Sequence, residues 1–149
     1  MDLRNVPPPD LEDPLFRLYW EGTAQGKLLL PRCCGCGRMN WPPRAICRGC
    51  RAVEFAWEQQ RPSGTLFSWT VVGRATAPGY LDVPYTVGII ALDDVPVRLM
   101  GQVVGVDPKN VVMGMPLSAR FTTAGSSPEF TLIQFEPNPT SPGDIDLRT

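Results

Sequence analysis

The sequence contains no histidine, and only two of its fourteen basic residues are lysines. The lack of histidine excludes Ser–His and Cys–His nucleophilic pairs and every zinc site that uses an imidazole ligand. No apolar run approaches the roughly 20 residues that a membrane-spanning helix needs. The first fourteen residues, MDLRNVPPPDLEDP, have neither the basic nor the apolar segment of a secretory signal. These absences predict a cytoplasmic protein without membrane association, a setting in which structural disulfides are rare.

The net charge of −1 conceals an asymmetry along the chain. Residues 23–53 contain six basic side chains and no acidic one, whereas the remainder has eight basic and fifteen acidic side chains. The basic segment surrounds the cysteines, and two explanations for it are open. The arginines balance the charge of about −2 on a zinc ion held by four thiolates, or they bind an anion.

All five cysteines lie within eighteen positions. Cys33-x2-Cys36 and Cys47-x2-Cys50 form two pairs that are separated by ten residues. Each pair can present two sulfurs to one ion, so together they predict a tetrahedral four-thiolate site. Such a site has no open position for substrate or water, and we therefore expect the metal to be structural.

The sequence around the four ligands also bears on the turns, the fifth cysteine and the identity of the metal. Gly37 and Gly49 supply the backbone freedom that tight turns around a metal require. Cys34 is left over, because a Cys34-x-Cys36 pair would shorten the chelating turn; we interpret it as a bystander, with a reactive thiol as the alternative. The same four sulfurs would also hold iron, but nothing else in the sequence indicates electron transfer, so zinc is favoured.

The remaining chain divides into a helical lead-in and a β-rich body. Residues 1–13 are Pro-rich and acidic and predict an extended or disordered segment. A helix is predicted at 14–22, with Asp13 as its N-cap, followed by a short strand at 27–30. Residues from 137 onward lack apolar periodicity and predict a tail. The expected divisions are 1–29 for the extension and helix, 30–53 for a zinc ribbon, 54–136 for a β-domain and 137–149 for the tail.

The β-domain carries five short apolar segments with turn residues between them. We expect strands at 65–73, 85–92, 97–104, 117–122 and 130–135. Gly88 and Gly101 fall inside strands and indicate bulges or sharp coiling, as the closure of a small barrel requires. The fold class is thus mainly β, and five coiled antiparallel strands are typical of an OB-fold barrel. An SH3-like barrel or a small sandwich has a similar strand count.

The order of these motifs resembles that of the DUF35 family. Five segments carry the resemblance, and they span most of residues 14–136: GKLLLPRCCGCG, WPPRAICRGC, SGTLFSWTVV, VPYTVGIIALDD and GMPLSARF. The resemblance implies an N-terminal helix, a rubredoxin-like zinc ribbon and an acyl-CoA-associated OB-fold. The doubled Cys33-Cys34 departs from the family pattern, which needs a single cysteine at this place.

The resemblance also implies an accessory role. Members of the family bind thiolase-superfamily enzymes, including sterol-carrier-type aldolases, and some work beside a MaoC-type hydratase. They are thought to help hold the acyl-CoA while the partner supplies the catalytic groups. The lack of histidine agrees with a subunit that is not catalytic alone. We accordingly expect a hetero-oligomer with a thiolase-like enzyme, with two copies of each chain.

Two groups of residues are candidates for these interactions. Binding of CoA phosphates favours arginines near an aromatic or apolar wall, and Arg44, Arg48 and Arg51 lie around the second cysteine pair. Each of them could instead be a solvated or charge-balancing residue. The helix has more apolar surface than one stripe can bury, and its Phe16, Tyr19 and Trp20 are candidates for a partner interface.

Two other classes of function compete with this hypothesis. Zinc ribbons and OB-folds also occur in nucleic-acid-binding proteins, but the predicted barrel is poor in basic residues, and we expect no nucleic acid partner. In the barrel, Phe67 and Trp69 more often indicate core than a stacking platform. A free-standing enzyme is the least favoured class, because acids such as Asp82 and Asp93 lie in turns without an evident second catalytic group.

Overall fold

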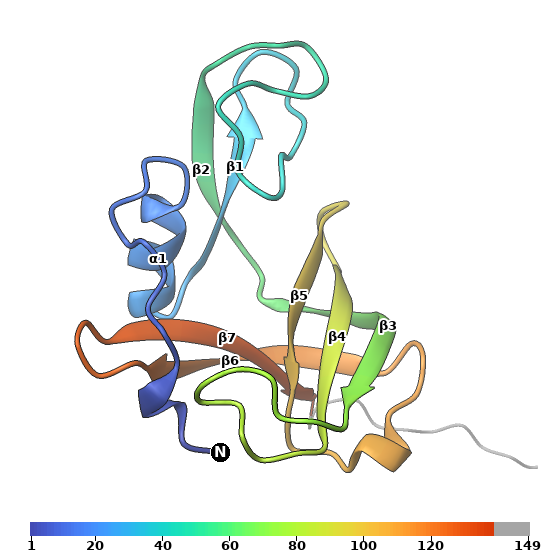
Figure 1. Ribbon diagram of the computed structural model, residues 1–149. Coiled ribbons are helices and arrows are strands. Elements are labelled where there is room, and N and C mark those ends of the chain that lie inside the picture. The colour runs from blue at the N-terminus through green and yellow to red at the C-terminus, as the bar shows by residue number, and fades with distance from the viewer. Residues whose placement is uncertain (139–149) are drawn as a thin grey trace, which may run out of the picture.

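The structure is a computed structural model that describes residues 1–138. The predicted tail at 137–149 lies outside the described residues, apart from its first two. The elements follow the order η1 (Leu3–Asn5), α1 (Arg17–Ala24), β1 (Leu28–Cys33), β2 (Phe55–Gln60), β3 (Ser63–Val72), β4 (Tyr85–Leu92), β5 (Arg98–Val103), η2 (Pro108–Asn110), β6 (Pro116–Ala124) and β7 (Phe130–Pro137). In Figure 1 a two-stranded hairpin with long loops stands above a barrel, and α1 lies beside the foot of the hairpin.

The barrel confirms the predicted mainly-β fold with five strands. Its strands are hydrogen-bonded in the order β3-β4-β5-β7-β6, and β6 returns to β3. All neighbours are antiparallel except β5 and β7, which are parallel and share only the pairs Gln102–Gln134 and Val103–Phe135. At this junction the Gln134 Nε2 donates to the Gln102 Oε1 at 2.8 Å, and the Thr122 Oγ1 donates to the Gln134 Oε1 at 2.8 Å. A closed sheet has no free edge, which excludes the alternative of an open sandwich.

Gly88 and Gly101 have a different role from the predicted one. They lie opposite each other in the regular ladder of β4 and β5, and the register shift occurs instead in β3, between Leu66 and Ser68. A Cβ on Gly88 would be 2.7 Å from the Leu66 Cδ1, and one on Gly101 would be 2.8 Å from the Phe135 ring. Both glycines therefore leave room for core side chains, which the sequence pattern alone does not reveal.

The hairpin is longer than the predicted ribbon. β2 pairs with β1 along its whole length, from Leu28–Gln60 to Cys33–Phe55. β2, which lies in the segment assigned to the β-domain from the sequence, is hydrogen-bonded to β1, and the closed barrel sheet begins at β3. Leu28 and Leu30 are buried at the foot of the hairpin and belong to one core cluster with Leu66, Ile90 and Phe135 of the barrel.

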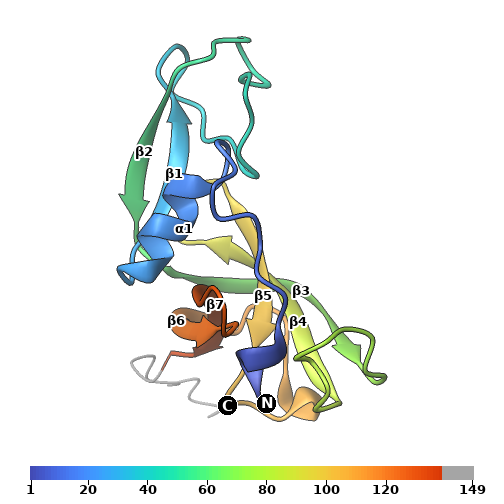
Figure 2. The ribbon, with the colours of Figure 1, turned by 60° about the vertical axis from the view of Figure 1, so that its left-hand side comes forward.

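The N-terminal segment, which was predicted to be extended or disordered, packs on the barrel. Figures 1 and 2 show it running along the barrel toward α1. Leu3 and Val6 are each 8% exposed and form a second apolar cluster with Ala124 and Phe130. The Gly125 N–H donates to the Leu3 carbonyl at 3.0 Å. Two apolar residues that pack on the barrel therefore order this segment, although it is otherwise Pro-rich and acidic.

The helix begins and ends later than predicted. Asp13 caps a preceding turn, in which its carboxylate accepts the Leu15 N–H at 2.9 Å, and α1 itself begins at Arg17. Gly22, predicted to end the helix, lies inside α1. A Cβ at this position would be 2.8 Å from the Leu29 Cγ. Gly26, with φ +70°, adopts the left-handed conformation just after the helix. The absence of a side chain at Gly22 thus allows α1 to pack closely against β1.

The shared core generates a prediction about stability. Leu30 is fully buried, so Leu30→Ala should lower the free energy of unfolding by about 2–5 kcal/mol. Leu81 is 64% exposed, and Leu81→Ala should change it by no more than about 0.5 kcal/mol. Urea denaturation of both variants and the parent, followed by tryptophan fluorescence, provides the measurement. Equal losses in the two variants would show that β1 does not contribute to a core shared with the barrel.

Candidate functional site

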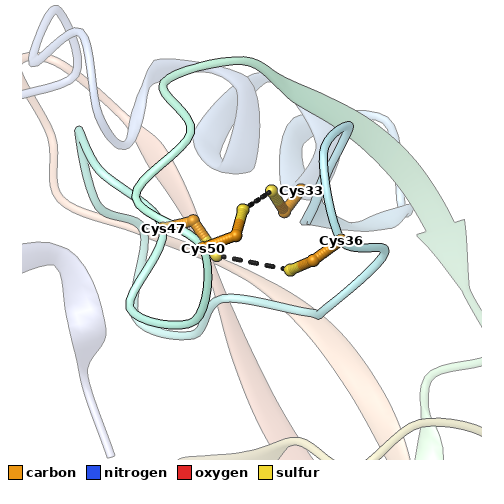
Figure 3. A group of neighbouring side chains, drawn as sticks. All are labelled: Cys33, Cys36, Cys47 and Cys50. Atoms are coloured by element: carbon orange, nitrogen blue, oxygen red, sulfur yellow. Dashed lines mark hydrogen bonds between the residues drawn. The ribbon is translucent and has the colours of Figure 1, made fainter.

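The four cysteines of the two predicted pairs meet at the far end of the hairpin (Figure 3). Their sulfur atoms all lie within 4.8 Å of one another, with 3.5 Å between Cys33 and Cys50 and 3.7 Å between Cys36 and Cys47. A disulfide requires about 2.05 Å between sulfurs, so these are free thiols. A tetrahedral ion with metal–sulfur bonds of about 2.3 Å has sulfur–sulfur edges of about 3.8 Å. The cluster therefore has the dimensions and donor atoms of a four-thiolate metal site.

The two cysteine pairs adopt the same backbone turn. In the first, the Gly37 N–H donates to the Cys33 carbonyl at 2.9 Å; in the second, the Arg51 N–H donates to the Cys47 carbonyl at 3.0 Å. Gly37 and Arg51 have φ values of 73° and 65°. Arg51 thus adopts the left-handed conformation that the sequence analysis expected of Gly49. At Gly49 a Cβ would be 3.1 Å from the Nε of the exposed Arg38 side chain, which packs against this turn.

Backbone amides donate hydrogen bonds to both buried sulfurs. The Gly35 N–H donates to the Cys33 Sγ and the Gly49 N–H to the Cys47 Sγ, each at 3.3 Å. The N–H groups of Cys50 and Gly49 lower the pKa of the Cys47 thiol to about 6. The Ala52 N–H also lowers the pKa of Cys50, but desolvation and the neighbouring thiols raise it to about 11 overall. A divalent cation held among the four sulfurs would be bound by their thiolate forms.

Asn40 links the two cysteine pairs, and the sequence analysis did not identify it. Its side chain is 1% exposed, and its Nδ2 donates to the Arg38 carbonyl at 3.0 Å and to the Cys47 Sγ at 3.5 Å. Its Oδ1 accepts the Arg48 N–H at 3.2 Å. A buried asparagine between the two pairs fits the pattern of outer residues that orient metal ligands. No spacing rule in the sequence distinguishes it from other asparagines.

Cys34 lies outside the cluster. It is exposed, and its backbone N–H donates to the Glu54 carbonyl at 3.0 Å. This hydrogen bond belongs to the hairpin, so the backbone of Cys34 contributes to the structure while its thiol contacts none of the clustered sulfurs.

The three candidate phosphate-binding arginines are exposed but do not converge. Arg44 lines a cavity of about 240 Å³ on the hairpin, together with Trp57. Arg48 lines a larger groove of about 450 Å³ between the hairpin and the barrel. Arg51 lines neither of these two cavities. Neither of these two cavities is lined by more than one of the three arginines.

The aromatic residues of α1 form part of the folded body. Tyr19 lies between Trp20 and Trp41, with ring centroids 4.9 and 5.1 Å away, and burial raises the pKa of its phenol to about 12. Trp20 also contacts Phe130 edge-to-face, and Phe16 contacts Trp41 in the same manner. All three candidate interface residues remain half-buried, so each retains some accessible surface.

Among residues 1–138, no helix has the length and apolar character that crossing a bilayer requires.

Comparison with family models accounts for both parts of the structure. Residues 20–55 match the model for the ChsH2 rubredoxin-like zinc ribbon domain, and residues 57–122 match that for the ChsH2 C-terminal OB-fold domain. The first match contains all four clustered cysteines, and the second contains most of the barrel. The barrel is therefore an OB-fold.

Known relatives fall into two kinds. The chain is 34% identical over 113 residues to a DUF35 domain-containing scaffold protein of Methanocaldococcus jannaschii, with 74% of this chain and 79% of the relative covered. It is 28% identical over 119 residues to a protein of Thermomonospora curvata named as a probable enoyl-CoA hydratase alpha subunit. That match covers 80% of this chain but only 36% of the relative, so the chain spans about a third of that protein's length.

A solved structure titled Ltp2-ChsH2(DUF35) aldolase has the same fold. Its matching chain superposes with a TM-score of 0.78 at 25% identity, and the match covers 87% of this chain and 98% of that one. The zinc-ribbon and OB-fold matches, the scaffold-protein relative and this structural likeness agree with one another. The chain belongs to the DUF35 family.

Proposed function

We propose that this chain is a non-catalytic accessory subunit, which binds a thiolase-like enzyme, either a thiolase or a sterol-carrier-type aldolase, and helps to hold its acyl-CoA substrate. The observation that carries this proposal is the likeness to nearly the whole DUF35 chain of the Ltp2-ChsH2 aldolase. The relative named as an enoyl-CoA hydratase alpha subunit supports a role beside an enzyme of CoA thioesters. The lack of histidine supports a partner that supplies the acid–base chemistry.

The proposed metal is one structural zinc ion, held by Cys33, Cys36, Cys47 and Cys50. The distances between their sulfurs support tetrahedral coordination, and four protein ligands leave no position for substrate. When bound, the ion would fix the far end of the hairpin, where residues 34–54 form no helix or strand. Its role is thus to shape the surface formed by residues 34–54, which includes the three exposed arginines.

The proposed contacts to substrate and partner come from the two candidate groups. Arg44, Arg48 and Arg51 have no ion-pair partner among residues 1–138, so their guanidinium groups are available to the phosphates of CoA. The accessible parts of Phe16, Tyr19 and Trp20 are the proposed partner interface, in an assembly with two copies of each chain. Aromatic side chains that are already fixed by packing lose little conformational entropy when they bind.

The metal site leads to the first functional prediction. The protein purified under reducing conditions should contain one equivalent of zinc per chain, measured by mass spectrometry of the metal. Cys50→Ser should lose the ion and disorder the loops, because such a site forms only when the chain folds around the metal. Cys34→Ser is the matched control and should retain the full metal content. If the control loses the ion, the first ligand has been assigned to the wrong cysteine.

Asn40 provides a second test of the same site. Asn40→Ala removes the amide that donates to the Cys47 sulfur and accepts the Arg48 N–H, so zinc affinity should fall by about 10–100-fold. Competition with a chromogenic chelator measures this affinity. Asn110→Ala, at an exposed position in η2, should leave it unchanged. Equal affinities for the two variants would mean that Asn40 stabilises only the backbone.

The partnership is tested by co-expression of this chain with a candidate thiolase-like enzyme from the same genome. Phe16→Ala combined with Trp20→Ala should weaken co-elution on size exclusion while zinc content is retained. Met113→Ala removes an apolar side chain that is 73% exposed in the loop between η2 and β6, and should have no effect. Because Trp20 also packs against Phe130, the unfolding of the double variant is measured in parallel. An enzyme that is fully active and soluble alone, and does not co-elute with this chain, would contradict the proposed function.

A further inference from the structure

The larger of the two hairpin cavities described above lies where the hairpin faces the barrel. The groove has a volume of about 450 Å³, which is within the range of about 300–1,000 Å³ common for small-molecule sites. Trp41 and Arg48 line it from the hairpin. The end of β4, the turn that follows it and Arg98 at the start of β5 line it from the barrel. In Figure 1 the β4–β5 hairpin rises toward the loops of the β1–β2 hairpin.

The groove is lined by two arginines that form no ion pair among residues 1–138. Five arginines of residues 1–138 form ion pairs with acidic side chains: Arg4, Arg17, Arg32, Arg61 and Arg120. Arg48 and Arg98 form none within that part of the chain, and both line the groove. Both acids of the adjacent turn are directed to other partners: Asp94 pairs with Arg61 at 2.7 Å, and Asp93 accepts the Ser63 hydroxyl at 2.8 Å and also interacts with the Arg61 charge. An anion is thus the ligand that the electrostatics of the groove favour.

Both arginines are positioned by contacts that leave their donors free. The Arg98 guanidinium lies 3.7 Å from the centroid of the Phe67 ring, so its flat face is occupied while the N–H groups along its edge remain available. The backbone N–H of Arg48 donates to the Asn40 Oδ1. This hydrogen bond fixes the backbone from which the Arg48 side chain extends. In this arrangement two sets of guanidinium donors can reach phosphate oxygens from opposite walls.

Trp41 forms an aromatic wall of the same groove. Its ring is supported by Tyr19, 5.1 Å away between centroids, and by Phe16 at 6.3 Å. A fixed indole beside two unpaired arginines is suited to a ligand that combines a flat aromatic base with several phosphates.

We propose that the groove binds the nucleotide end of CoA, with adenine against Trp41 and the phosphates at Arg48 and Arg98. This inference rests on the proposed function, which supplies CoA as the ligand. Of the three candidate arginines on the hairpin, this inference assigns phosphate contacts to Arg48 alone. It adds Arg98, which belongs to the barrel. The substrate would then be held by the hairpin and the barrel together.

The test is isothermal titration of the full, zinc-loaded chain with CoA. Arg48→Ala and Arg98→Ala should each weaken binding by about tenfold or more, since a charge-assisted hydrogen bond is lost in each. Arg74→Ala is the matched control, because it removes an equally charged, exposed arginine that does not line the groove. Dephospho-CoA and ADP, which lack one or more of the phosphates, should bind more weakly than CoA, and pantetheine should not compete.

Three outcomes would overturn the inference. The first is the absence of saturable CoA binding, and the second is unchanged binding in the combined Arg48→Ala/Arg98→Ala variant. The third is ADP binding as tightly as CoA, which would indicate a general nucleotide site. Co-elution with the enzyme is measured on the same variants and separates this inference from the proposed function. If the combined variant loses the enzyme but retains CoA, the groove is part of the interface and the accessory role still stands.

Discussion

The apolar contact between the foot of the hairpin and the barrel is the interaction on which the arrangement of the whole chain depends. Leu28 and Leu30 lie in the same buried cluster as Leu66 and Phe135, so no boundary of the core separates the two parts. A hairpin of this size cannot build a sufficient core of its own. It is held at one end by side chains that it inserts into the barrel core and at the other by the cysteine cluster. The apolar contact with the barrel core sets the position of the hairpin over the barrel, and the groove between the two parts follows from that position.

Much of the fold could be predicted because each part has a strong local pattern. In β4 (YTVGIIAL), buried and half-buried positions alternate along the whole strand, and its predicted bounds agree with the structure. The two Cys-x2-Cys pairs likewise indicate which sulfurs meet, since the short spacing restricts each pair to one tight turn. Signals of this kind depend only on neighbouring residues, and tertiary contacts reinforce them.

The parts that could not be predicted depend on contacts between distant residues. The segment FAWEQQ has too little alternation to indicate a strand, and it becomes β2 only because β1 offers it a partner. The lead-in has a disordered composition, yet Leu3 and Val6 find a hydrophobic site on β6 and β7. Asn40 and Arg98 acquire their roles from the cysteine turns and from the Phe67 ring, respectively. No residue adjacent to either of them in the sequence indicates these roles.

The barrel resists strand separation least at the parallel junction of β5 and β7. Every other pair of neighbouring barrel strands shares at least three register positions, whereas this pair shares two. The chain of side-chain hydrogen bonds through Thr122, Gln134 and Gln102 replaces part of the missing backbone ladder. Amide protons near this seam should therefore exchange with solvent through local separation of the two strands, at a lower free energy than global unfolding. Fluctuations in the diameter of the barrel are thus concentrated at the junction of β5 and β7.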